Sequence, residues 1–109
     1  MAYDEGLSQR IRETLMDQPG MVEKKMFGGL AFMVNGHMSV GVVHSDLMVR
    51  VGPDNYQDAL SQPHARPMDF TGKPLKGFVY IDQKGFEADS DLTYWVGRGL
   101  DYALSLPPK

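Results

Sequence analysis

The stretch MFGGLAFMVNGHMSVGVV, residues 26 to 43, decides how this chain folds. Its dipeptide Asn35-Gly36 separates two apolar runs, which is the strongest short-range signal for a hairpin with a two-residue type I′ turn. A turn of that length fixes the register of its two strands. The pairs expected from it are Val34 with His37, Met33 with Met38, Phe32 with Ser39, Ala31 with Val40 and Leu30 with Gly41.

The hairpin register also predicts which side chains share a face of the sheet. A second turn near Ser45-Asp46 is expected to place Val42 opposite Val49 and Val40 opposite Val51. Successive side chains of a strand point to opposite faces, so each strand contributes every second residue to the core. The core face expected from this register carries Ala31, Met33, Met38, Val40, Val42, Val49 and Val51.

The glycines of the same stretch invite a second interpretation, a loop that cradles a phosphate group. Their spacing matches neither GxGxxG nor GxxxxGK[ST], and no helical pattern follows to offer its N-terminus to an anion. We therefore expect Gly28-Gly29 to permit a bend or bulge between a strand around residues 22–26 and the strand that begins at Leu30.

Helical periodicity appears at both ends of the chain. Residues 5–18, EGLSQRIRETLMDQ, place apolar side chains on one helical stripe, and Asp4 is the expected N-cap. Residues 91–106, DLTYWVGRGLDYALSL, form an almost unbroken apolar stripe, which Asp89 or Ser90 can cap. Gly99 lies on that stripe, which predicts close backbone contact between this helix and the sheet.

Between these helices the pattern predicts a short helix over residues 56–60, an irregular loop over residues 64–77 and a strand over residues 77–82. The expected order is α-β-β-β-β-α-β-α in one domain spanning residues 1–109. This order is typical of a two-layer α+β fold, with a mainly antiparallel sheet of about five strands and helices packed on one face.

The composition limits the function classes. The chain has no cysteine, which excludes disulfides, thiolate zinc sites and cysteine nucleophiles and suits a reducing cytoplasm. Its net charge of −3, with scattered basic residues, counts against nucleic acid as the main partner. No apolar run is long enough for a membrane span. The eight methionines fit either core filling or an adaptable binding surface.

The face opposite the expected core is also apolar. In the expected register it carries Leu30, Phe32, Val34, Val43 and Met48. A contiguous apolar patch of this size marks a contact surface, for self-association or for a protein partner. The other interpretation is that a helix, the long loop or the chain end covers it.

Reactive groups are sparse in this sequence. His37, His44 and His64 lack the spacing of a metal site and are expected to be surface residues, and no GxSxG motif is present. The loop over residues 64–77 is the remaining candidate site. Either an Arg50–Asp69 ion pair ties this loop to the sheet, or basic side chains build an anion-binding pocket. The candidate residues for the loop site are Arg50, Arg66, Asp69 and Lys73.

Several segments together resemble the N-terminal domain of the TfoX/Sxy family. They are KKMFGGLAFMVNGHM, LMVRVGPDNYQDAL, ARPMDFTGKPLKGFVYI and the closing LPPK, and the likeness covers nearly the whole chain. The resemblance implies a small two-layer α/β domain of bacterial origin with a role in regulating natural competence genes and their transcription. It implies no cofactor, metal or catalytic residue. Longer TfoX-like regulators continue into a helical C-terminal domain, so the sequence given is expected to be a stand-alone N-terminal module.

These observations lead to a ranked set of functional hypotheses. The first is a non-enzymatic cytoplasmic regulatory or adaptor domain that works by protein association, including as a homodimer. The second is a binder of a small anion or metabolite, or an enzyme, that uses the loop of residues 64–77 and Arg50. Direct nucleic-acid binding ranks last.

Overall fold

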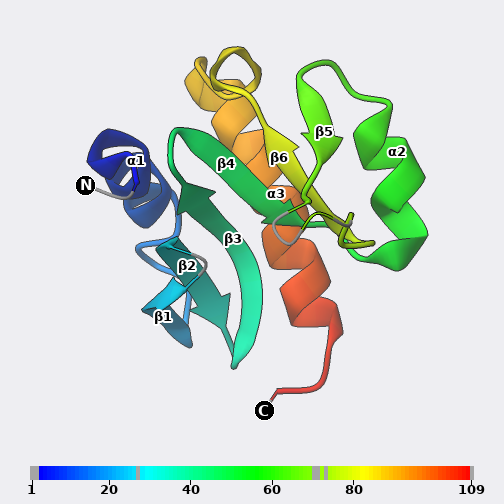
Figure 1. Cartoon of the computed structure of the whole chain (residues 1–109). Helices are drawn as coiled ribbons and strands as arrows, with labels where there is room; N and C mark the ends of the chain where they lie inside the picture. The colour runs from blue at the N-terminus through cyan, green and yellow to red at the C-terminus, as the bar shows by residue number, and fades with distance from the viewer. Residues whose placement is uncertain (1–2, 27, 70–71, 73, 109) are drawn as a thin grey trace.

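The computed structural model describes residues 3–26, 28–69, 72 and 74–108. Figure 1 shows a twisted sheet with helices behind and beside it. The elements in chain order are α1 (Glu5–Thr14), β1 (Met21–Met26), β2 (Gly29–Val34), β3 (His37–Val43), β4 (Asp46–Arg50), the 3-10 turn η1 (Pro53–Asn55), α2 (Tyr56–Leu60), β5 (Ala65–Pro67), β6 (Phe78–Ile81), the 3-10 turn η2 (Gln83–Gly85) and α3 (Asp89–Ser105).

The strands form one antiparallel sheet in the order β1-β2-β3-β4-β6-β5. The α+β class is therefore confirmed, with six strands in place of about five. The additional strand is β5, which has only three residues and ends in a proline. Such a segment carries no periodic signal, and its proline suits the edge position that it occupies.

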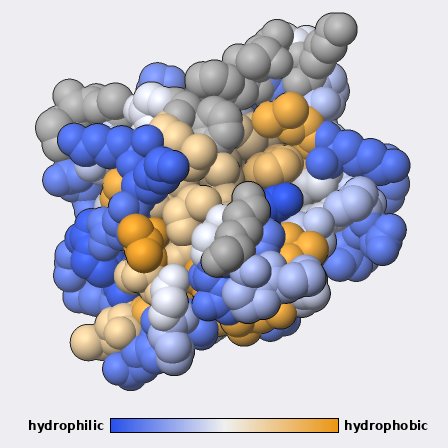
Figure 2. All heavy atoms as spheres, turned by 90° about the horizontal axis from the view of Figure 1, so that it is seen from below, coloured by the Kyte–Doolittle hydropathy of each residue, from blue (hydrophilic) through white to orange (hydrophobic). Residues whose placement is uncertain are grey.

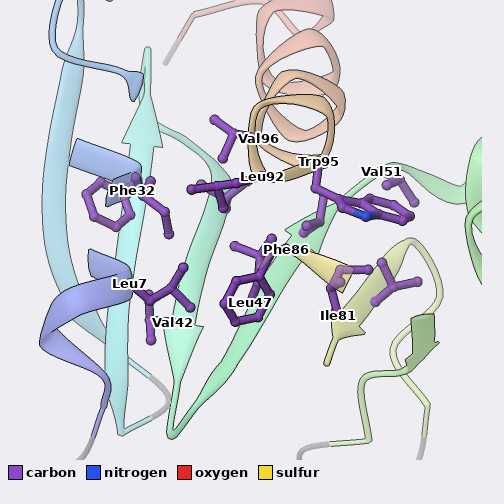
Figure 3. Packing of buried hydrophobic residues seen from close by; sticks show 14 of the residues in the cluster. Leu7, Phe32, Val42, Leu47, Val51, Ile81, Phe86, Leu92, Trp95 and Val96 are labelled. Carbon is purple, nitrogen blue, oxygen red and sulfur yellow. The ribbon is translucent and has the colours of Figure 1, made fainter. Parts of the chain in front are cut away.

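All three helices pack against the same face of the sheet, which we call the helix-covered face. Its core includes Leu7 and Ile11 of α1, Tyr56 of α2, and Leu92 and Trp95 of α3. Figure 3 shows Leu7, Leu92 and Trp95 among the side chains that meet between the helices and the strands. The sheet contributes Leu30, Phe32, Val40, Val42, Leu47, Val49, Val79 and Ile81, and Val51 joins them directly after β4.

The β2–β3 hairpin has the predicted turn, with φ of 54° at Asn35 and 84° at Gly36. Val34 pairs with His37, and Met33 pairs with Met38, as expected. The register then shifts at a bulge, where Ser39 is the extra residue and its Oγ donates a hydrogen bond of 2.8 Å to the carbonyl oxygen of Phe32.

The bulge makes the rest of the predicted hairpin register wrong. Beyond it the observed pairs are Phe32 with Val40, Ala31 with Gly41 and Leu30 with Val42. One extra residue on β3 moves the partners of β2 by one position, and a shift of one exchanges the faces. Leu30 and Phe32 therefore join the helix-covered face, while the predicted core residues Ala31, Met33 and Met38 lie on the other face.

The β3–β4 pairing differs from the prediction by two residues. The turn consists of residues 44–45, and Val40 pairs with Val49 and Val42 with Leu47. A shift of two leaves every side chain on its face, because the side-chain period of a strand is also two. Val40, Val42, Val49 and Val51 accordingly lie in the predicted helix-covered core.

The helix ends follow the sequence signals in part. The Asp4 carboxylate accepts a hydrogen bond of 3.1 Å from the Leu7 N–H, so the predicted cap of α1 is confirmed. The expected cap of α3 by Asp89 or Ser90 is wrong, because Ala88 is the N-cap and gives no side-chain hydrogen bond.

Among the described residues, no helix has the length and apolar character needed to cross a bilayer.

Candidate association surface

The predicted contact patch does not form a surface. Leu30, Phe32 and Val34 are buried, the first two of them under the helices. Val43 and Met48 do lie on the opposite face, but only 4% and 1% of their surface is exposed. The alternative in which the chain covers its own patch is therefore correct for Val43 and Met48.

The cover of this second face comes from the segment between β5 and β6, so we call it the loop-covered face. Met68 is fully buried there, Leu75 packs beside it, and the Leu75 N–H donates a hydrogen bond of 2.8 Å to the Met68 carbonyl oxygen. The face comprises Ala31, Met38, Val43, Met48, Met68 and Tyr80, with Met26, Met33, Leu75 and Phe78 partly buried against them.

Five of the eight methionines lie in this loop-covered cluster. Methionine is flexible enough to fill the irregular space between a sheet and a loop without regular structure. The complete burial of Met48 and Met68 therefore supports core filling as their role. Figure 2 views the molecule from below and shows hydrophobic residues together near the middle of that face, with hydrophilic residues on either side of them.

The predicted anion site is not assembled by the described residues. Arg66 Nη2 lies 2.5 Å from Asp46 Oδ2, its Nη1 lies 3.2 Å from Asp82 Oδ1, and its guanidinium carbon lies 4.9 Å from the centre of the Tyr80 ring. Two carboxylates and an aromatic ring thus already engage this cation. Burial raises the pKa of the Tyr80 hydroxyl, the Asp46 charge adds to the rise, and Arg66 opposes it.

Arg50 lies apart from that cluster, with its guanidinium carbon 5.5 Å from the centre of the Phe78 ring and 5.2 Å from that of Tyr102. The structure shows no ion pair between Arg50 and Asp69, both of which it describes, and Asp69 is exposed. The fourth candidate, Lys73, lies outside the described residues. The Arg50–Asp69 pair is therefore wrong.

The histidines occupy three different settings. His37 is buried, contrary to the expectation of a surface position, and its Nε2 donates a hydrogen bond of 2.7 Å to the Pro107 carbonyl oxygen. This contact ties the end of the chain to the β2–β3 hairpin. His44 and His64 are exposed and have φ of 55° and 69°. Within the described ranges no three His, Cys, Asp or Glu side chains gather as metal ligands.

A shallow hollow of about 220 Å³ lies where the loop after α2 meets η2 and the first turns of α3. Its rim carries cationic Lys84, anionic Asp91 and His64, and the Trp95 indole forms part of its wall. Neither Arg50 nor Arg66 reaches it. The described structure therefore offers the small-ligand hypothesis a different location from the one predicted.

The longer of the two edge strands of the described sheet is β1, which pairs with β2 alone. Val22 is 60% exposed on the loop-covered side, and Glu23, Lys24 and Lys25 are exposed beside it. Met16, on the segment that leads from α1 into β1, is 72% exposed. These are the two most exposed of the large apolar side chains that are described, and both belong to this end of the molecule.

One side of the edge is held by an ion pair to α1. Arg12 Nε donates a hydrogen bond of 2.6 Å to Glu23 Oε2, and Arg12 Nη2 donates one of 2.8 Å to Glu23 Oε1. This bond holds the pKa of Glu23 below its usual value, although partial burial opposes the shift. The strand was predicted around residues 22–26, but its edge position was not. Adjacent lysines, which are common on edge strands, were the available signal.

A family model described as the TfoX N-terminal domain matches residues 13–103. No curated protein and no solved structure matches the chain. The matched segment runs from the last turn of α1 to α3 and so includes every strand of the sheet.

Proposed function

The chain belongs to the TfoX N-terminal domain family, and on that premise we propose that it is a regulatory or adaptor domain that acts by protein association and without catalysis. The observation that carries this proposal is the open edge of β1 with its exposed Val22. An edge strand presents unpaired backbone N–H and C=O groups, to which an extended segment of another chain can add as a further strand. The setting that we propose is cytoplasmic, in the control of competence genes and their transcription.

A matched pair of variants tests this function. Val22→Asp places a charge on the edge strand, and Leu104→Asp makes the same change on α3, where the leucine is 46% exposed. Each variant, tagged and expressed in the native cell, is compared with the unchanged chain for the proteins that it retains. We expect Val22→Asp to lose a partner that Leu104→Asp keeps, with equal melting temperatures for both variants. Equal retention by both would contradict an association through β1.

The same proteins distinguish the small-ligand hypothesis. A ligand at free concentration L that binds only the folded state stabilises it by RT ln(1 + L/Kd), so the melting temperature rises with the logarithm of the ligand concentration once that concentration exceeds the dissociation constant. A gain with phosphate, sulfate or a small carboxylate that Lys84→Ala abolishes would assign function to the hollow beside His64. If the chain acts by protein association alone, we expect none of these anions to raise its melting temperature.

A further inference from the structure

The direction of the free backbone groups on β1 follows from its hairpin with β2. Met26 pairs with Gly29 across a connection of two residues, and the pair that closes such a connection exchanges hydrogen bonds between its backbone groups. Hydrogen-bonded pairs alternate along an antiparallel ladder, so Lys24 and Val22 also turn their backbone groups toward β2. The N–H and C=O groups of Met21, Glu23 and Lys25 therefore point away from the sheet.

We propose that the strand that adds to this edge is β1 of a second copy, running antiparallel about a two-fold axis at Lys24. The inference rests on the proposed association through β1 and names its partner. In this register Glu23 and Lys25 lie opposite the partner's Lys25 and the partner's Glu23. Both are residues with outward backbone groups, so each pair exchanges two backbone hydrogen bonds.

The side chains in this register complement one another on both faces. Residues with odd numbers lie on the helix-covered side, where Glu23 meets the partner's Lys25 with opposite charge. Residues with even numbers lie on the loop-covered side, where Val22 meets the partner's Met26 and removes exposed apolar surface from water. An isologous interface requires this kind of self-complementarity, because each contact occurs twice.

The alternative register with the axis at Glu23 is less favourable. It places Glu23 opposite the partner's Glu23, and it places Val22 opposite the partner's Lys24. Like charges directly opposite destabilise an antiparallel pair, and an apolar side chain opposite a lysine gains little. The charge pattern of β1 therefore favours the axis at Lys24 over the axis at Glu23.

The selected register contains one unfavourable contact, since Lys24 lies opposite the partner's Lys24. This contact gives the two adjacent lysines different roles in the dimer, although both are exposed and have the same charge. Lys25 attracts the partner's Glu23, whereas Lys24 repels its own copy. Replacing Lys24 by a neutral residue is thus expected to strengthen the dimer, and reversing the charge of Lys25 is expected to weaken it.

The test measures the mass of the purified whole chain by light scattering and sedimentation over a wide range of concentration. We expect the unchanged chain to form a dimer, and we expect Lys25→Glu to raise the dissociation constant of that dimer about tenfold or more. Lys24→Glu should change the dissociation constant little, because two opposed glutamates replace two opposed lysines. Lys24→Gln is expected to lower the dissociation constant. The double variant Glu23→Lys with Lys25→Glu restores opposite charges across the axis and is expected to recover part of the dimer, since it also removes the carboxylate that Arg12 bonds.

Backbone amide exchange supplies a second measurement. The amides of Glu23 and Lys25 should be protected more strongly as the concentration rises, because these groups point toward the partner. A monomer at every concentration would overturn the proposal, as would equal effects of Lys24→Glu and Lys25→Glu, which report net charge alone. If the chain is a monomer and Val22→Asp still fails to retain a protein that the unchanged chain retains, only the identification of the partner as a second copy is overturned. A dimer with equal retention by Val22→Asp and Leu104→Asp would overturn only the regulatory association.

Discussion

Gly99 of α3 lies directly on the backbone carbonyl of Ser39, the residue that β3 adds at its bulge. A Cβ at position 99 would overlap the Ser39 oxygen and would stand 2.7 Å from Val40 Cγ1. The predicted close contact between this helix and the sheet is therefore confirmed. The helix reaches the strand backbone at the point where the register of the hairpin changes.

The two glycines of α3 are expected to respond in opposite ways to the same substitution. Gly99→Ala forces the helix away from β3 and should lower the free energy of unfolding by about 1–3 kcal/mol. Gly97 has no atom within 4 Å of the position of a Cβ, so Gly97→Ala gains helix propensity alone, about 1 kcal/mol. Urea unfolding of both variants measures the difference. A gain in stability at both positions would contradict the close approach at Ser39.

The hairpin shows which part of the fold the sequence could reveal. The Asn35-Gly36 turn was predictable because both residues adopt positive φ, a conformation that few other residues tolerate. The bulge at Ser39 has no comparable signature, since a serine also fits a regular strand. Its stabilisation comes from tertiary structure, namely the hydrogen bond to the Phe32 carbonyl and the contact with Gly99.

The extra residue Ser39 also explains why the predicted contact patch was wrong. The apolar character of both sheet faces was evident from the hairpin, but the assignment of Leu30 and Phe32 to the outer face depended on an unbroken register. The cover over Met48 comes from Met68 and Leu75, in a segment whose aperiodic sequence gives no indication of where it packs. Alternation within a strand can be read from sequence, whereas the path of an irregular loop depends on contacts distant along the chain.

The loop that carries Met68 is expected to belong to the cooperative core. Met68→Ala removes a fully buried side chain and should lower the free energy of unfolding by about 2–5 kcal/mol. Met16→Ala is the matched control, because that methionine is 72% exposed and its loss should change stability by less than about 0.5 kcal/mol. Chemical denaturation followed by circular dichroism checks both values. Similar small effects would show that the loop does not stabilise the face beneath it.

Arg66 is expected to influence the titration of Tyr80. Its charge opposes the rise in the Tyr80 pKa that burial causes, so Arg66→Met should move the pKa further upward. Arg66→Lys keeps the charge and should move the pKa less, while it loses about 1 kcal/mol of stability with the planar contacts to the ring and to Asp46. Phenolate absorbance against pH measures the shift, and subtraction of the Tyr80→Phe curve isolates this tyrosine. An unchanged titration in Arg66→Met would contradict the stacked geometry.

The bond between Arg12 and Glu23 is expected to make stability depend on pH on the acid side. The folded state lowers the pKa of Glu23 below its ordinary value of 4.5, so this stabilisation is present above that value and is lost as the pH falls through the lower folded pKa. Glu23→Gln should cost about 0.5–1 kcal/mol at neutral pH, and the cost should disappear in acid. Urea unfolding at two pH values and at low protein concentration, where association does not contribute, measures this difference. Glu87→Gln, which makes the same substitution at another exposed glutamate, is the matched control. A cost for Glu23→Gln that persists in acid would assign the role of Glu23 to packing of its side chain, because a protonated carboxyl no longer attracts the guanidinium.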